Sequence, residues 1–128
     1  MRFMMMVKHP EQFSGPPPKA LMDAIAKLSE DAVNDKTMVL GGALAPMALT
    51  TRVRLSSGTV NSTDGPFSET KEVVGGFAIF DLPSREVAIE NARQFMELHR
   101  QHWPGWEGET EVRQIFGPED FPRLGCGA

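Results

Sequence analysis

Two segments of the chain, residues 2–7 and 73–82, are apolar at almost every position. Successive side chains of a β-strand point to opposite faces, so a strand made from either segment is apolar on both sides. Strands of this kind are usually covered on both faces. We therefore expect two central strands, each with a helix on one side and a second layer on the other.

A period near 3.6 residues predicts two helices, over residues 19–35 and from Ser84 to about His102. Pro18 is suited to the first turn of the first helix. Ser84 can cap the second helix, whose first turn also carries Glu86. The apolar stripes are Leu21, Ala24, Ile25, Leu28 and Ala32 in the first helix and Ala88, Ile89, Ala92, Phe95, Met96 and His99 in the second.

The remaining apolar segments predict further strands at 37–44, 50–55, 59–62 and 109–116, with a turn at 56–58 joining the middle pair. The resulting order is β-α-β, a β-hairpin, then β-α-β. This order predicts an α+β fold of the ferredoxin-like, split βαβ type with a β-hairpin extension. We expect one domain over residues 1–128, in which residues 119–128 form a flexible tail.

Two helices cannot cover both faces of the predicted sheet, although its central strands are apolar on both. The uncovered face must therefore pack against something outside the chain. We predict a homodimer in which two such sheets pack face to face.

Charge and composition exclude several classes of function. The net charge is −4, and the second half holds 6 basic and 11 acidic residues, so we expect no nucleic-acid binding. The longest apolar run has five residues, too few for a membrane span or a secretory signal. The single cysteine, Cys126, has no internal partner for a disulfide. These features predict a cytoplasmic protein that does not enter a membrane.

Common catalytic motifs are absent from the sequence, including GxGxxG, the P-loop, GxSxG, HExxH and CxxC. His99 and His102 have a spacing that can share a metal, but an inward His99 is more often a hydrogen-bonded core residue. Trp103 and Trp106 either form a lid or partner contact or cap the core. We expect no metal and no cofactor.

Ionisable residues gather in and around residues 63–72, after the turn signal Asp64-Gly65-Pro66. One interpretation is a pocket with acid–base chemistry: Asp64 or Glu72 as the acid or base and Lys71 as its electrostatic partner. The other is an ordinary surface ion-pair network, with Phe67 inserted into the core. The full set comprises catalytic candidates Asp64, Glu72 and Lys71 and ligand-binding candidates Arg54, Glu69 and Arg113.

These residues also carry a family resemblance. The segment "TDGPFSETKE" at 63–72 with "GGF" at 75–77 resembles the signature of the DGPF-domain subgroup of the YCII-related family. Further matching segments are "RFMMMV" at 2–7, "GGAL" at 41–44 and "EVR" at 111–113. The resemblance implies a dimeric α/β-barrel of ferredoxin-like subunits in the bacterial cytoplasm.

The resemblance leaves two functions open. The wider family is proposed to use a His–Asp pair, but the predicted helix at 19–35 contains no histidine, so that mechanism does not transfer. One function is binding of an unidentified small molecule near residues 63–72. The other is a non-catalytic accessory role in extracytoplasmic-function sigma-factor signalling, since DGPF-type proteins are often encoded beside such factors. That role would use the loop that contains Trp103 and Trp106, which we call the tryptophan loop, or the acidic second half of the chain.

Overall fold

The computed structural model describes residues 1–10, 16–67 and 72–120. No helix in these ranges is both long and apolar enough to cross a membrane. The strands are β1 (Arg2–Pro10), β2 (Met38–Ala43), β3 (Thr51–Ser56), β4 (Thr59–Asp64), β5 (Glu72–Asp81) and β6 (Glu109–Ile115). The helices are α1 (Lys19–Asn34) and α2 (Arg85–His102), with short 3₁₀ turns η1 (Met47–Leu49) and η2 (Pro118–Asp120).

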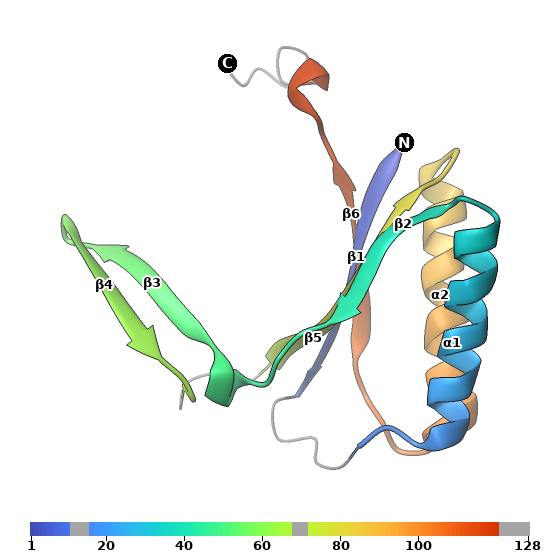
Figure 1. Cartoon of the computed structure of the whole chain (residues 1–128), viewed down its shortest axis with the longest axis horizontal. Coiled ribbons are helices and arrows are strands. Elements are labelled where there is room, and N and C mark those ends of the chain that lie inside the picture. Colours follow the sequence, from blue (N-terminus) through green and yellow to red (C-terminus); the bar gives the residue numbers. More distant parts are fainter. Residues whose placement is uncertain (11–15, 68–71, 121–128) are drawn as a thin grey trace.

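Four strands form one antiparallel sheet in the order β2-β5-β1-β6. The helices α1 and α2 lie side by side on one face of this sheet, while β3 and β4 form a separate hairpin that extends away from it (Figure 1). This arrangement confirms the predicted α+β class. Its strand order and directions are compatible with a ferredoxin-like fold.

The central strand β1 is apolar on both faces, as its sequence predicts. Phe3 and Met5 are buried on the helix side, in a cluster with Leu82 and with Ala88 and Ala92 of α2. Met4 and Met6 point to the other face, opposite Ile79 and Phe77 of β5. No described element of the chain covers this second face, which we call the open face.

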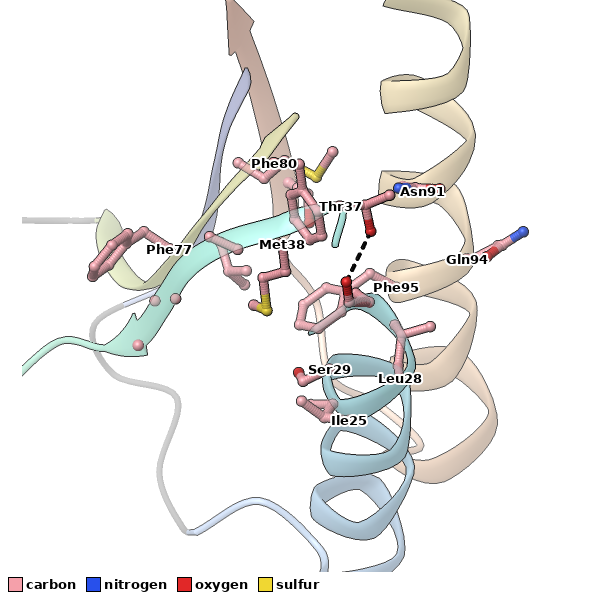
Figure 2. Close-up of a pocket in the computed structure, with 18 of the residues that line it drawn as sticks. Ile25, Leu28, Ser29, Thr37, Met38, Phe77, Phe80, Asn91, Gln94 and Phe95 are labelled. Carbon is pink, nitrogen blue, oxygen red and sulfur yellow. Dashed lines mark hydrogen bonds between the residues drawn. The ribbon is translucent and has the colours of Figure 1, made fainter. Parts of the chain in front are cut away.

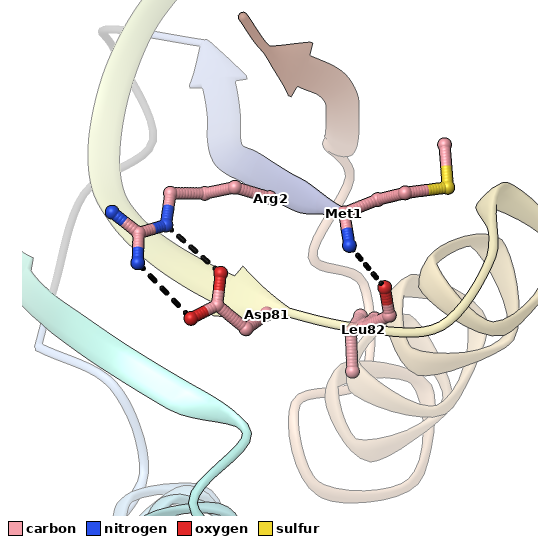
Figure 3. Close-up of polar contacts among 4 residues, drawn as sticks. All are labelled: Met1, Arg2, Asp81 and Leu82. Carbon is pink, nitrogen blue, oxygen red and sulfur yellow. Dashed lines mark hydrogen bonds and ion pairs between the residues drawn. The ribbon is translucent and has the colours of Figure 1, made fainter. Parts of the chain in front are cut away.

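The start of β1 is fastened to the end of β5. Arg2 donates two hydrogen bonds to the Asp81 carboxylate, at 2.8 and 3.0 Å, and the Met1 amino group donates to the Leu82 carbonyl at 2.9 Å (Figure 3). The Arg2 guanidinium holds the pKa of the Asp81 carboxyl below its usual value. Because the ion pair is exposed, it contributes more to the register of the strands than to stability.

The helix boundaries follow the sequence signals closely. The Ser84 hydroxyl accepts a hydrogen bond from the Val87 amide, which confirms the predicted cap of α2. Pro18 is the residue before α1 rather than part of its first turn, and its carbonyl accepts from the amides of Leu21 and Met22. The first helix ends at Asn34, one residue earlier than expected.

Residues Thr51–Asp64, which we call the arm, form the predicted hairpin, but β4 continues to Asp64 instead of ending at residue 62. The root of the arm is well anchored. The Gly65 amide donates to the Thr50 carbonyl, and the Arg52 guanidinium lies 3.8 Å from the centre of the Phe67 ring. Phe67 is buried, as the ion-pair interpretation of this segment expected.

Candidate functional site

A large cavity, which we call the helix–sheet cavity, lies between the two helices and the β2–β5 half of the sheet. Its volume is about 1030 Å³, and its walls are mainly apolar. Figure 2 shows Ile25 and Ser29 of α1, Phe95 of α2 and Met38 of β2 around it. Ligand pockets in proteins are typically about 300–1,000 Å³ and mostly apolar, so this cavity has the size and character of a small-molecule site.

The cavity exists because two neighbouring residue pairs of β2 and β5 carry only small side chains beneath α1. Residues opposite one another in an antiparallel pair share a face. The pairs Gly41–Ala78 and Ala43–Gly76 therefore both face the helices. In β1 the helix-facing residues are large, and Phe3 and Met5 fill the space under α2. No large side chain stands at the two small pairs, although Met38 of β2 borders them.

One of these floor positions is in close contact with the cavity wall. A Cβ atom on Gly41 would lie 2.6 Å from Cε of Met38 and 3.3 Å from the Phe77 carbonyl oxygen. A side chain at this position would displace the end of the Met38 side chain from its place in the wall.

Aromatic rings line one end of the cavity. His99 lies between Phe95 and Trp106, with ring centroids 4.8 and 4.5 Å away, and Trp106 stacks on Trp103 at 6.1 Å. The four rings all line the cavity. The tryptophan loop therefore caps the core and at the same time forms a wall of the candidate site.

His99 is a buried, hydrogen-bonded residue, as the core interpretation of the sequence expected. Its Nδ1 lies 2.9 Å from the Phe95 carbonyl oxygen, which can only accept, so Nδ1 carries the proton. Burial lowers the pKa of the imidazole. Within the described ranges, no group of three or more His, Cys, Asp or Glu side chains is placed to hold a metal ion.

This lowered pKa predicts a dependence of stability on pH. Below a pH of about 6.5, the ordinary histidine value, the unfolded chain binds more protons at this position than the folded chain does. The contribution of neutral His99 is therefore complete above pH 6.5 and is lost as the pH falls toward the folded-state value. The free energy of unfolding is measured with urea for the wild type and for His99→Phe, one pH unit above and one below 6.5. It should decrease more in the wild type than in the variant between the higher and the lower pH. Equal decreases would contradict a lowered pKa for His99.

The structure places the residues predicted from segment 63–72 on separate elements. Asp64 ends β4, where its Oδ1 accepts a hydrogen bond from the Thr51 hydroxyl at 2.7 Å. Arg54 lies on β3 opposite Asn61, and both Asp64 and Arg54 are exposed. Glu69 and Lys71 lie outside the described residues. No described residue between 63 and 72 lines the helix–sheet cavity.

The other two candidates lie on the main sheet. Arg113 is on the open face of β6, opposite Met4, at the sheet edge farthest from β2. Glu72 starts β5 within electrostatic reach of Lys8, whose pKa is raised chiefly by its 3.0 Å hydrogen bond to Glu111. A single chain therefore does not bring Arg113 together with the arm. The ion pair Lys8–Glu111 was not anticipated from the sequence.

Sequence reasoning also missed the residues that form the cavity. The signal was present in the two Gly-Gly pairs, at 41–42 and 75–76, which are followed by small or aromatic residues. The glycines lead to a cavity only because the strand register places Gly41 beside Ala78 and Ala43 beside Gly76. His99 and the tryptophans were singled out from the sequence, but their place in one wall was not predicted.

Comparison with known proteins identifies a curated relative and a family for this chain. An uncharacterized protein of Rhizobium meliloti (strain 1021) is 32% identical over 81 residues, which cover 62% of this chain and 61% of that protein. The chain thus spans about three-fifths of the length of this curated relative. The model of the YCII-related domain matches residues 1–99, from β1 into the end of α2. Since this match covers more than three-quarters of the 128 residues, we conclude that the chain belongs to the YCII-related family.

Proposed function

We propose that this protein binds a small, largely apolar molecule in the helix–sheet cavity. The observation that carries the proposal is the cavity itself, about 1030 Å³ in a chain of 128 residues. Protein interiors normally pack as densely as organic crystals, and voids larger than a water molecule are few. A space of this size under α1 therefore has the dimensions of a binding site rather than of a packing defect.

We propose further that the protein acts as a homodimer of the DGPF subgroup, with the open faces of two sheets packed together. The support is the apolar character of the open face, where Met4, Met6, Phe77 and Ile79 are half-buried by their neighbours and lack a covering layer. Contiguous apolar surface of this kind is typical of interfaces. A second copy supplies an equivalent surface, because a two-fold interface joins the same patch on both subunits.

The residues around segment 63–72 remain a second proposed site, with Asp64 or Glu72 as the acid or base and Lys71 as its electrostatic partner. Arg113 and the arm lie apart in one chain, so we propose that a second chain completes this site. The arm is suited to such contact, because its apolar side chains are exposed. They are Val53, Leu55 and Val60, which the strand register sets on one face.

That exposed apolar face also favours the accessory function as a second candidate. Val53, Leu55 and Val60 are each about two-thirds exposed or more, at 68%, 72% and 65%. The arm makes no extended contact with another described helix or strand. A protein partner of a signalling pathway is the alternative occupant of this surface.

Replacing Ala78 by Leu tests the cavity as a binding site. The larger side chain points from the floor into the space under α1, so we expect Ala78→Leu to lower the affinity for the neutral fluorescent dye Nile red by about tenfold or more. The measurement is a fluorescence titration of the wild type and the variant. Ala20→Leu is the matched control, because Ala20 is exposed on α1 and does not line the cavity.

A further variant separates the cavity from the open face. Ile79→Glu alters the open face beside Met4 and leaves the cavity floor intact. Dye binding that survives Ala78→Leu and disappears in Ile79→Glu would contradict the proposed function, because the dye would then be on the open face.

A further inference from the structure

We infer that the ligand of the helix–sheet cavity is a neutral molecule with an aromatic ring and a hydroxyl or amine hydrogen-bond donor, of which a substituted phenol is the simplest example. The inference rests on the proposed function and names its ligand class. Three features of the cavity wall carry it: its charged groups, its aromatic end, and the hydrogen-bond acceptor of His99.

The charged groups of the wall disfavour an anion. Among the described residues that line the cavity there is no lysine and no arginine, whereas two carboxylates, Asp31 and Asp35, are present. Asp31 is already paired with Lys27 at 3.1 Å. A carboxylate or phosphate entering an apolar space needs a cation or several donors to offset its lost hydration. A neutral ligand has no such requirement.

The aromatic end of the cavity is suited to an aromatic ring. His99 contacts Phe95 and Trp106 at centroid distances of 4.8 and 4.5 Å, and Trp103 extends the group. Aromatic rings attract one another in tilted or offset arrangements at 4.5–7 Å. A planar ring of the ligand can therefore join this group with the same geometry.

His99 supplies a hydrogen-bond acceptor at that end. Since its Nδ1 proton is donated to the Phe95 carbonyl, the neutral ring carries its lone pair on Nε2. Burial of the ring favours this neutral form. A ligand in the cavity that carries a hydrogen-bond donor can therefore donate to Nε2.

Three probes that differ at one position test this inference: 4-butylphenol, 4-butylanisole and 4-butylbenzoate. All three have a benzene ring and a butyl group. Near neutral pH the phenol carries a hydrogen-bond donor, the anisole carries none, and the benzoate carries a negative charge. The readout is tryptophan fluorescence, because both tryptophans of the chain line the cavity and the chain has no tyrosine. We expect the phenol to bind roughly three- to tenfold more tightly than the anisole, the span of one net hydrogen bond. The benzoate should bind most weakly.

The variant His99→Phe keeps an aromatic ring and removes the acceptor. It should abolish the preference for phenol over anisole, which is read as the ratio of the two affinities measured on the variant itself. The ranking of the probes on wild type needs no variant, so it decides the ligand class even where His99→Phe fails to fold. Each titration is repeated on Ala78→Leu, which should weaken binding of all probes that occupy the cavity.

Two outcomes overturn the inference while the proposed function survives. One is benzoate binding as tightly as phenol with the same sensitivity to Ala78→Leu; the other is equal binding of phenol and anisole. If neither the three probes nor Nile red binds in a manner sensitive to Ala78→Leu, the proposed function itself is wrong.

Discussion

Phe3→Ala is expected to lower the free energy of unfolding by about 3–5 kcal/mol, the usual cost of removing a fully buried aromatic ring. Phe3 is 1% exposed, on the central strand, and packs with Met5, Leu82 and the two buried alanines of α2. Removal leaves a second void beside a sheet that already borders the helix–sheet cavity. For a chain of this size the midpoint of thermal unfolding should fall by about 10–20 °C.

The matched control is Phe116→Ala, the same chemical change at a ring that is 39% exposed beyond β6. We expect a clearly smaller loss there, because less apolar surface leaves water on folding. Both variants are measured by urea and thermal unfolding at one protein concentration, since dimer stability depends on concentration. Phe3→Leu provides a milder change where the alanine variant fails to fold. Equal losses for Phe3→Ala and Phe116→Ala would show that the core does not centre on β1.

Ile79→Glu is expected to convert the proposed dimer into a monomer of 14.1 kDa. Ile79 lies on the open face between Met4 of β1 and Leu40 of β2. In a single chain the new carboxylate remains in contact with water. In a face-to-face dimer it is buried without a partner, at a cost of several kcal/mol per subunit. Sedimentation velocity or light scattering should give twice the chain mass for wild type and the chain mass for the variant.

The control for this experiment is Ala20→Glu, which adds the same charge on the exposed surface of α1. This variant should keep the mass of the wild-type protein. A wild type that is monomeric at all micromolar concentrations, or an Ile79→Glu variant that stays dimeric, would exclude packing through the open face. The arm would then be the next surface to test, with Leu55→Glu.

The order of elements and most of their boundaries were predicted from the sequence. The largest difference concerns β1, which runs to Pro10 instead of residue 7. The three extra residues, Lys8, His9 and Pro10, do not continue the apolar pattern of residues 3–7, so periodicity alone ended the strand too early. The first two are held in the strand by pairing with Val74 and Val73 of β5, far away in the sequence. The local pattern of apolar residues predicts burial well, but it does not predict pairing with a strand that is distant in the sequence.

The candidate site was predicted less completely. Asp64, Arg54 and Arg113 were grouped because they are ionisable and come from segment 63–72 or from other predicted strands. The sheet order separates β6 from the arm, and sequence contains no direct information on that order. The helix–sheet cavity depends on small residues from β2 and β5 meeting on one face. Their positions, Gly41 and Ala78, are 37 residues apart and become neighbours only through the strand register.

The sequence by itself determined the α+β class, the two amphipathic helices, the cap at Ser84, and the doubly apolar β1 and β5. These features follow from side-chain periodicity and local hydrogen bonding, which act over a few residues. Only the tertiary structure decided where space is left between the layers, and which rings surround it. Void space depends on the difference in side-chain size between elements that meet in the fold, so it is a property of the packed molecule and not of any one segment.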